Sequence, residues 1–306
     1  MTLYRSHRSL PPAARGAVVA IGNFDGVHRG HQHLIAQAAA EARRLGAPLG
    51  VLTFEPHPRR LFRPDDPPFR LTPLRTKLPL LRGLGVDRVY ALRFDRAFSL
   101  LDAEAFVRDV LVEGLGVAHV AVGRDFEYGH KRGGSAATLA AHSEFGVTIV
   151  EKLADPDGDT VSSTAVRHAL RDGRPAEAAR LLGRPFAISG FVRRGDQRGR
   201  TIGFPTANLT LGPYLRPGYG VYAVRARLAD GRSAGGVANL GIRPTVGGLR
   251  ELFEIHLFDF EGDLYGRRLE VELLHFIRPE RKFDSFDALR AQIAQDAQAA
   301  RGLLAK

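Results

Sequence analysis

A glycine-rich segment with two closely spaced histidines gives the strongest chemical signal in the sequence. Residues 22–31 read Gly22-Asn23-Phe24-Asp25-Gly26-Val27-His28-Arg29-Gly30-His31. They follow a short apolar run at 17–21 and lead into a segment with helical spacing. A turn between a strand and a helix places backbone N–H groups and the positive end of the helix where a phosphate can bind. We call residues 22–31 the glycine turn.

The histidines of the glycine turn suit nucleotidyl transfer. His28 and His31 lie three residues apart on either side of Gly30, so both imidazoles can face the same phosphates. There they would donate hydrogen bonds to oxygens on which charge develops during displacement at an α-phosphorus. Gly30 would let the backbone approach a nucleotide closely. The alternatives are ordinary surface or capping histidines, or a zinc site, which a chain without cysteine supports poorly.

Two further segments could complete a nucleotide site. Ser162, Ser163 and Thr164 open a predicted helix, with Arg167 one turn later. Hydroxyls at this position are typical of helix caps, but with Arg167 they could also grip the β- and γ-phosphates of ATP. Residues 123–129, which include Asp125, leave a predicted strand at the edge where doubly wound sheets bind ligands.

The C-terminal half has its own polar pair, Thr206 and Asn208. The preceding segment holds Gly195 and Gly203, and Pro205 restricts the backbone. Two residues apart on an extended chain, Thr206 and Asn208 would lie on the same side. A hydroxyl and an amide oxygen suit an Mg²⁺–phosphate site, because Mg²⁺ takes few protein oxygens and shares the rest with water and substrate. An ordinary turn followed by a strand fits the same spacing.

Strand and helix signals alternate through the first half of the chain. This alternation predicts a parallel, doubly wound α/β sheet of Rossmann-like type. Gly46 is a predicted helix C-cap, Asp102 a predicted N-cap, and the Pro-rich stretch 59–73 a predicted surface loop. The expected strands are 17–21, 49–54, 88–94, 117–122 and 147–151, and the expected helices are 30–45, 74–84, one after Asp102, and 135–145.

The pattern changes near residues 183–185. Predicted strands separated by turn-rich pieces indicate an antiparallel barrel or sandwich, followed by a helix at 286–304. A short helix pair, 163–170 and 176–182, precedes the change. We therefore predict two domains, 1–184 and 185–306, which the length of 306 residues also favours. The expected barrel strands are 187–192, 221–228, 233–240, 252–258 and 268–276.

Composition limits the classes of function. The net charge is +11, and residues 184–306 hold 19 Lys+Arg against 13 Asp+Glu, so the excess is spread over both halves. This spread favours anionic small substrates over nucleic acid. No run of eighteen apolar residues suggests a membrane span, and the N-terminus lacks the apolar core of a signal peptide. The absence of cysteine suits a cytoplasmic protein. Oligomeric state is open, with a monomer or weak homo-oligomer expected.

The glycine turn and the late Ser-Ser-Thr-x-x-Arg element resemble the nucleotidylyltransferase superfamily. The full string of the turn is similar to the adenylyltransferase domain of the bifunctional riboflavin kinase/FAD synthetase family. Residues 53–58 and 123–129 match that family, and Gly203-Phe204-Pro205-Thr206-Ala207-Asn208 resembles its kinase motif. The resemblance covers residues 16–302 and implies a Greek-key barrel that converts riboflavin to FMN. FMN phosphate would then attack the α-phosphate of ATP in the α/β domain, giving FAD and pyrophosphate with Mg²⁺.

The resemblance also implies residue roles. Glu254 takes the position of the family's catalytic base for phosphorylation, and Thr206 and Asn208 the metal position. His28 and His31 would act in adenylyl transfer. Residues implied for ATP binding are Gly22, Asn23, Phe24, Asp25, Gly30, Ser163, Thr164, Arg167, Gly195 and Gly203. Residues implied for flavin binding are Phe54, Pro56, His57, Pro58, Asp125, Arg281 and Phe283.

The sequence departs from the family pattern at two positions. Thr76 stands where the family often has a carboxylate, and Ser135 replaces an acidic residue that commonly follows residue 134. Two alternatives follow. In the first, only one of the two steps is active. In the second, the barrel is a flavin- or RNA-binding module, an alternative that the net charge of +11 suggests. Loss of activity in a Glu254→Ala variant separates the enzyme from the binding module.

Overall fold

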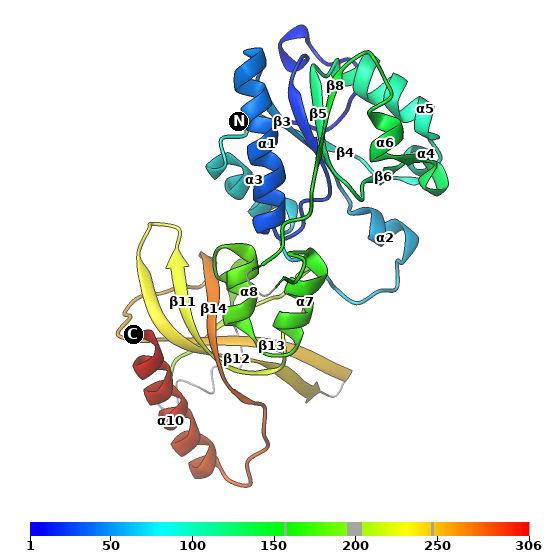
Figure 1. Ribbon diagram of the computed structural model, residues 1–306. Helices are drawn as coiled ribbons and strands as arrows, with labels where there is room; N and C mark the ends of the chain where they lie inside the picture. The colour runs from blue at the N-terminus through cyan, green and yellow to red at the C-terminus, as the bar shows by residue number, and fades with distance from the viewer. Residues whose placement is uncertain (156–157, 195–203, 246–247, 306) are drawn as a thin grey trace. The chain divides into compact units, whose positions relative to one another are not determined.

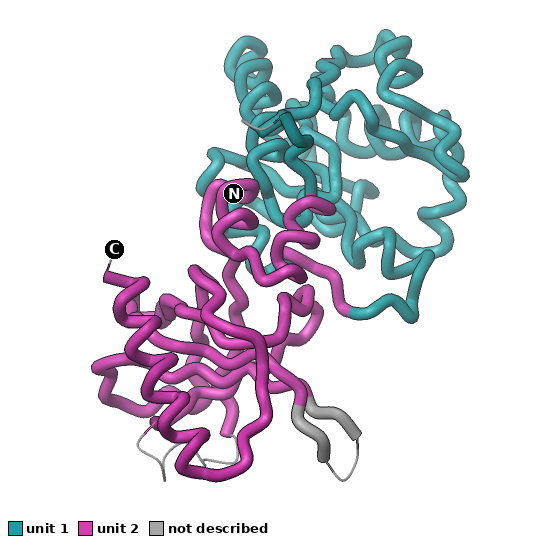
Figure 2. The backbone as a smooth tube through the Cα atoms, turned by 60° about the horizontal axis from the view of Figure 1, so that its bottom comes forward, with its two compact units in different colours: residues 1–67, 72–162 teal, residues 68–71, 163–306 magenta. Residues whose placement is uncertain are grey.

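The chain folds into two compact units. The computed structural model describes residues 1–155, 158–194, 204–245 and 248–305. Unit 1 holds residues 1–67 and 72–162, and unit 2 holds residues 68–71 and 163–306 (Figure 2). These units describe how the chain packs and not which part carries which activity. The division into an adenylyltransferase domain, 1–184, and a kinase domain, 185–306, therefore remains a prediction.

Unit 1 is built on a six-stranded sheet in the order β1-β4-β3-β2-β5-β8 (Figure 1). Every neighbouring pair is parallel, which confirms the predicted doubly wound sheet. The order reverses at β2, whose neighbours β3 and β5 both follow it in the chain; ligands bind outside the carboxyl ends of strands at such a point. The strands are β1 (Thr2–Tyr4), β2 (Val18–Ile21), β3 (Leu49–Phe54), β4 (Arg88–Leu92), β5 (His119–Gly123) and β8 (Gly146–Val150).

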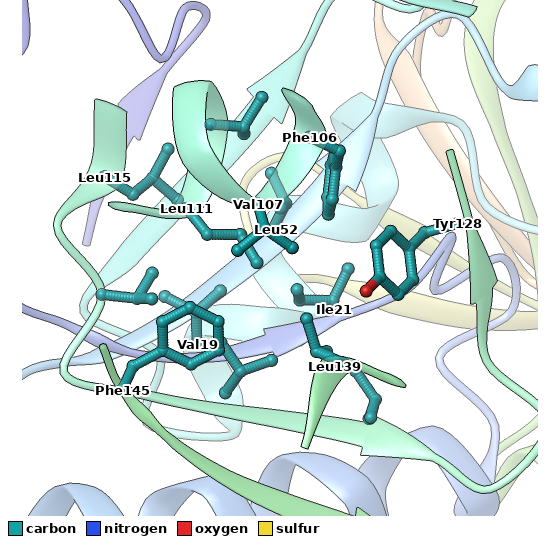
Figure 3. Packing of buried hydrophobic residues seen from close by; sticks show 14 of the residues in the cluster. Val19, Ile21, Leu52, Phe106, Val107, Leu111, Leu115, Tyr128, Leu139 and Phe145 are labelled. Carbon is teal, nitrogen blue, oxygen red and sulfur yellow. The ribbon is translucent and has the colours of Figure 1, made fainter. Parts of the chain in front are cut away.

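Helices cover both faces of this sheet. Val18 and Ala20 of β2 pack against apolar residues of α1 and α3, whereas Val19 and Ile21 join a second core with η2 and α6 (Figure 3). Alternate residues of a strand point to opposite faces, so an unbroken apolar run marks a strand that is buried on both sides. The helices are α1 (Arg29–Leu45), α2 (Pro58–Phe62), α3 (Leu74–Gly83), α4 (Arg96–Ser99), α5 (Ala103–Ala105), the π-helical η2 (Phe106–Leu115) and α6 (Ala136–Leu139), with short 3-10 turns η1 (Pro12–Ala14) and η3 (His130–Arg132).

Two expectations about unit 1 were wrong. The helix expected at 135–145 is only the short α6, since no residue between Leu139 and Phe145 is buried to hold a longer helix against the core. The stretch 59–73 is not simply a surface loop. It contains α2, and Leu71 and Thr72 are buried. Ser135 also pairs with residue 127 in a small hairpin of β6 (Glu127–Tyr128) and β7 (Gly134–Ser135).

Unit 2 is a closed six-stranded antiparallel barrel in the order β10-β13-β12-β11-β14-β9. Strands β11, β12 and β13 are consecutive neighbours, and β14 returns to lie beside β11, which is the Greek-key arrangement that was expected. The strands are β9 (Phe186–Arg193), β10 (Ala207–Leu209), β11 (Gly220–Leu228), β12 (Ser233–Thr245), β13 (Gly248–Leu257) and β14 (Arg268–Pro279).

Among the described residues of unit 2, three helices accompany the barrel. The C-terminal helix α10 (Phe286–Leu304) buries Ala297 and Ala300 against Val221 and Val237 on the outer face of the barrel. The predicted pair before the barrel is present as α7 (Ser163–Arg171) and α8 (Pro175–Leu182), and α8 contacts β9 and β14. The end of α8 at Gly183 has φ +73, a conformation that glycine adopts without steric cost.

Candidate functional site

The glycine turn leaves the carboxyl end of β2, beside the point where the strand order reverses. Its backbone is unusual, since Phe24 and Val27 adopt positive φ angles of 48° and 46°. Both side chains are buried in the core shared with α1, and this burial offsets the conformational strain. The turn therefore holds a fixed shape at the position where a doubly wound sheet binds its ligand.

The two histidines of the turn lie against each other. His28 is the N-cap of α1, and its Nδ1 accepts a hydrogen bond from the His31 N–H at 3.3 Å. Their rings stack with centroids 3.5 Å apart and planes at 22°. Because Nδ1 of His28 accepts, the proton of its neutral ring is on Nε2, which is then a donor. The two imidazoles therefore lie together at the N-terminus of α1.

Gly30 has a packing reason to be glycine. A Cβ at this position would lie 3.1 Å from the Val161 carbonyl oxygen and 3.2 Å from Nδ1 of His28. These distances are tighter than ordinary contacts, so a side chain would displace the His28 ring or residue 161. The glycine thereby keeps the imidazole in place.

Asp25 lies inside the turn. Its side chain is 1% exposed, and Oδ1 accepts the backbone N–H of Thr72 at 2.9 Å. The Thr72 hydroxyl oxygen in turn accepts a hydrogen bond from the Gly26 N–H at 2.8 Å. Thr72 was missed by the sequence analysis, since nothing in the pattern links two polar residues 47 positions apart. These contacts brace the turn from the loop that precedes α3.

Four of the predicted flavin residues, Phe54, Pro56, His57 and Pro58, lie at the carboxyl end of β3. Phe54 ends β3, and His57 caps α2 by accepting the Arg59 N–H on Nδ1 at 3.1 Å. Pro56 follows a cis peptide bond and Pro58 begins α2. Phe54 belongs to an aromatic cluster of four rings, whose neighbouring centroids lie 5.6–5.9 Å apart. We call this the aromatic cluster: Phe54, Phe62, Phe94 and Phe98.

Phe62 is the most exposed member of the aromatic cluster, at 66%. The sequence analysis missed it because Arg59 to Pro73 was taken as a loop, whereas α2 holds the Phe62 ring against Phe94. An exposed aromatic ring that is fixed by another ring offers a flat apolar face to a ligand.

Asp125 follows β5, on the other side of β2. Its carboxylate lies 3.0 Å from Nζ of Lys152. Next to it, Arg124 is paired with Glu151, and the guanidinium lowers the pKa of that carboxyl group through their hydrogen bonds. The segment after β5 thus carries a paired set of charges near the ligand-binding edge of the sheet.

The two departures from the family pattern serve as local caps. Thr76 donates its hydroxyl hydrogen bond to the Pro73 carbonyl in the first turn of α3, at 2.9 Å. Ser135 caps α6, where its hydroxyl oxygen accepts the Thr138 N–H at 3.2 Å.

The predicted phosphate-gripping residues Ser163, Thr164 and Arg167 belong to unit 2. Ser163 and Thr164 open α7. Nε of Arg167 donates to the Phe69 carbonyl oxygen at 2.9 Å, and its guanidinium lies 5.7 Å from the Phe69 ring centroid. The Arg167 side chain is therefore oriented by the segment 68–71 within the same unit.

The kinase candidates form a row across three strands of the barrel. Asn208 of β10 is directly opposite Glu254 of β13, and Glu254 is directly opposite Asn239 of β12. Directly opposite residues of antiparallel strands point to the same face, with Cβ atoms about 5 Å apart. We call Asn208, Glu254 and Asn239 the polar row. Asn239 was not singled out by the sequence, because only the pairing of β12 with β13 places it there.

Unit 2 also contains a pocket. It includes Thr206, which directly precedes β10, and the loop after β13 with Tyr265. That loop was missed by the sequence analysis. Gly195 and Gly203, both predicted for ATP, lie outside the described residues. The pocket is lined by Val192, Thr206, Ala207, Ile255, Leu264 and Tyr265, among others.

Arg281 and Phe283 follow β14. The Arg281 guanidinium lies 4.8 Å from the Phe283 ring centroid, and Arg278 approaches the same ring at 5.7 Å. Arg278 is also paired with the buried Asp296 of α10 at 2.7 Å. These contacts order the segment between β14 and α10.

The side-chain oxygen atoms of Thr206 and of the polar row are suitable ligands for Mg²⁺. Thr206 offers a hydroxyl oxygen and Asn208 an amide oxygen, with the Glu254 carboxylate opposite Asn208. Oxygen ligands of this kind suit Mg²⁺ shared with phosphate and water. In the part of the chain that the structure describes, no cluster of three His, Cys, Asp or Glu side chains is arranged for a metal. A metal here would depend on the phosphates of a nucleotide for its remaining ligands.

Comparison with known proteins identifies both halves of the chain. Residues 10–165 match the FAD synthetase family and residues 182–304 match the riboflavin kinase family. The bifunctional riboflavin kinase/FMN adenylyltransferase of Escherichia coli (strain K12) is 48% identical over 304 residues, which cover 98% of this chain and 97% of that one. The protein of the same description from Pseudomonas fluorescens is 46% identical over 308 residues, covering 100% and 98%.

A solved structure shares the architecture. The crystal structure of a macrolide-efflux protein from Streptococcus pneumoniae matches with a TM-score of 0.88 and 33% identity, over 98% of both chains. In this chain, none of the described helices is long and apolar enough to cross a membrane. With both family models matched in order along one chain, and close relatives similar over nearly their full length, the chain belongs to the bifunctional riboflavin kinase/FMN adenylyltransferase family, with the FAD synthetase in its N-terminal half and the riboflavin kinase in its C-terminal half.

Proposed function

We propose that His28 and His31 stabilise the adenylyl-transfer step directly. A phosphate oxygen of FMN attacks the α-phosphorus of ATP, a new P–O bond forms, and pyrophosphate leaves. The Nε2–H of His28 and the backbone N–H groups of the glycine turn would donate to the phosphate oxygens as their charge grows. The stacked geometry of the two rings at the start of α1 supports this assignment.

The remaining ATP contacts are assigned by position. Gly22, Asn23, Phe24 and Asp25 form the turn that would surround the phosphates, with Asp25 bracing it from inside. For Ser163, Thr164 and Arg167, which belong to unit 2, the resemblance to the family supports a role in binding the β- and γ-phosphates.

For the flavin of this step we propose the aromatic cluster, with Pro56, His57 and Pro58 at its border and Asp125 opposite, after β5. Phe54 and Phe62 offer flat apolar surface for a tricyclic ring system, and Phe62 keeps 66% of its surface exposed. The position of β3, β4 and β5 at the binding edge of the sheet supports this location.

Replacing Phe62 with alanine is expected to raise the KM for FMN about fivefold, because the lost aromatic contact is worth on the order of 1 kcal/mol. The KM for ATP and the rate of riboflavin phosphorylation should stay within twofold. Steady-state kinetics of FAD formation with FMN varied will measure this. Leu100→Ala removes another exposed apolar side chain of unit 1, 55% exposed, and should change none of these values. An unchanged KM for FMN in Phe62→Ala would rule out the cluster as the flavin surface.

For the kinase step we propose Glu254 as general base. It would accept the proton of the ribityl 5′-hydroxyl while that oxygen attacks the γ-phosphorus of ATP and ADP leaves. The pairing of Glu254 with Asn208 carries the proposal, because it sets the carboxylate beside the proposed metal ligand. Gly195 and Gly203, which lie outside the described residues, would contact ATP, and Arg281 and Phe283 would border the riboflavin ring.

Mg²⁺ would be held by Thr206 and Asn208 together with ATP phosphates, where it neutralises charge that develops on the transferred phosphoryl group. Chelation with excess EDTA is expected to lower both activities at least about a hundredfold, and added Mg²⁺ should restore them. Thr206→Ala should raise the Mg²⁺ concentration needed for half-maximal phosphorylation and leave the requirement of FAD formation unchanged. Equal Mg²⁺ dependence of phosphorylation in wild type and Thr206→Ala would contradict this ligand assignment.

The two steps can be followed in one tube. With riboflavin, ATP and Mg²⁺, FMN should appear first and FAD later, as separated by chromatography. The proposed division into a 1–184 adenylyltransferase domain and a 185–306 kinase domain is tested by single-site variants, each of which should affect one activity only. We further propose that the enzyme acts in the cytoplasm, consistent with the absence of cysteine, and as a monomer or weak homo-oligomer, which sedimentation will measure.

A further inference from the structure

Lys77 is a fully buried cation behind the glycine turn. It lies on α3, and its side chain is 0% exposed. Burial of an ammonium group is costly unless it is well hydrogen-bonded or paired. A lysine in such a place therefore has a defined set of partners, and these lead to the glycine turn.

The ammonium group of Lys77 reaches the backbone of the turn. Nζ donates to the Asn23 carbonyl oxygen at 2.6 Å and lies 3.3 Å from the Thr53 hydroxyl. Thr53, which is 0% exposed in β3, also donates to the Asn23 oxygen, at 3.1 Å. One carbonyl of the turn is thus held by two donors from two different elements.

The hydrogen bonds to the Asn23 carbonyl also fix the direction of the Phe24 N–H, which belongs to the same peptide group. In a planar trans peptide the C=O and N–H groups point in opposite directions. With the Asn23 oxygen drawn toward α3 and β3, the N–H of Phe24 must point to the opposite side. Phe24 has a φ of 48°, so its peptide plane needs such support to stay in place.

From these contacts we infer that Lys77 is a positioning residue for adenylyl transfer. It holds the Asn23–Phe24 peptide in the orientation that presents its N–H to phosphate, and it adds buried positive charge behind the site of the growing negative charge. Lys77 touches no substrate and acts through the glycine turn. The inference rests on the proposed assignment of that turn to ATP.

Lys77→Met keeps the length of the side chain and removes its charge and donors. Its kcat/KM for ATP in FAD formation should fall roughly tenfold to a hundredfold, because small displacements of binding groups have effects of this size. The KM for ATP should rise, whereas the KM for FMN should stay within twofold of the wild-type value. Riboflavin phosphorylation by the same chain should also stay within twofold, and the unchanged KM for FMN reports that unit 1 is folded.

Leu81→Ala is the matched control. Leu81 is 0% exposed on the same helix, one turn after Lys77, and its loss leaves a cavity without touching the turn. A variant that is only less stable should lose active molecules, which lowers kcat and leaves the KM for ATP unchanged. If Lys77→Met behaves like Leu81→Ala in this respect, the inference is wrong.

A second variant tests the inference if Lys77→Met does not fold. Thr53→Val is close to isosteric and removes one donor to the Asn23 oxygen, so the KM for ATP should rise about threefold to tenfold. An unchanged KM for ATP in Thr53→Val would then overturn the inference. The parallel His28→Asn variant tests the turn itself. If both Lys77→Met and His28→Asn form FAD normally, the glycine turn does not bind ATP. If only His28→Asn loses FAD formation, the turn keeps its proposed role and Lys77 has no positioning role.

Discussion

A Glu254→Gln enzyme is expected to stop phosphorylating riboflavin while it continues to make FAD from supplied FMN. Glutamine keeps the size of the side chain and can no longer accept the proton of the attacking hydroxyl. Loss of a general base lowers the rate by roughly 10²- to 10⁴-fold. Because Glu254 lies in the barrel and the glycine turn in unit 1, the adenylyl step should keep its rate within twofold.

The measurement is the initial rate of each step on the same protein sample, with riboflavin or FMN as the flavin. Glu251→Gln is a matched control, since Glu251 is a carboxylate on the same strand whose oxygens accept from Arg216 at 2.6 Å. It should phosphorylate riboflavin within about threefold of wild type. Equal losses in the two variants would mean that β13 is damaged in general and that Glu254 has no special role.

Within the polar row, Asn239 is placed to orient the carboxylate of the proposed base, Glu254. Asn239 is the neighbour of Glu254 on the side away from Asn208. An amide there can donate to the carboxylate and keep it directed at the substrate. The row distinguishes the proposed base from the other acids of the barrel by its two amide neighbours, which the spacing in the sequence did not reveal.

Local patterns predicted the elements of unit 1 well. The glycine turn and the end of α1 at Gly46 follow from residues that are neighbours in the chain. Parallel pairing followed from the alternation of strand and helix signals, because a helix between two strands lets them run in the same direction. Strand β1 (Thr2–Tyr4) was missed because three residues at a sheet edge are too few to show a period.

The supporting contacts of the sites could not be predicted in this way. Lys77 and Asn23 are 54 positions apart and Thr72 and Asp25 are 47 apart, so their contacts exist only after the sheet has formed. A lysine in a helix of mixed composition gives no local sign that it is buried. Similarly, η2 has the apolar spacing of an α-helix, and its wider π-helical turns arise from packing against the sheet.

The family motifs and the tertiary contacts thus carry different information. Motifs located the groups that would touch ATP and flavin, such as His28 and Glu254. The structure adds the residues that hold those groups, among them Thr72 and Asn239. Effects of substitutions in the second class should be seen in KM and in pH or metal dependence, because they act by moving a group that remains present.

A His28→Asn enzyme is expected to accumulate FMN from riboflavin, because FAD formation should fall roughly 10²- to 10³-fold when a donor to the developing charge is lost. Asparagine is chosen because its side-chain oxygen can still cap α1 by accepting the His31 N–H, which Nδ1 of His28 does now. The thermal unfolding temperature should therefore change little, and the loss can be attributed to the imidazole.

His33→Asn gives the matched control for this prediction. His33 lies on the same helix, two residues after His31, and neighbours at that spacing do not face the same side. It should make FAD within twofold of wild type, whereas His31→Asn should resemble His28→Asn because the two rings stack at 3.5 Å. Comparable FAD formation in all three variants would leave the histidine pair as a feature of helix capping. A loss confined to His28 and His31 would place the chemistry at their stacked rings, since the three variants differ only in which imidazole of α1 is removed.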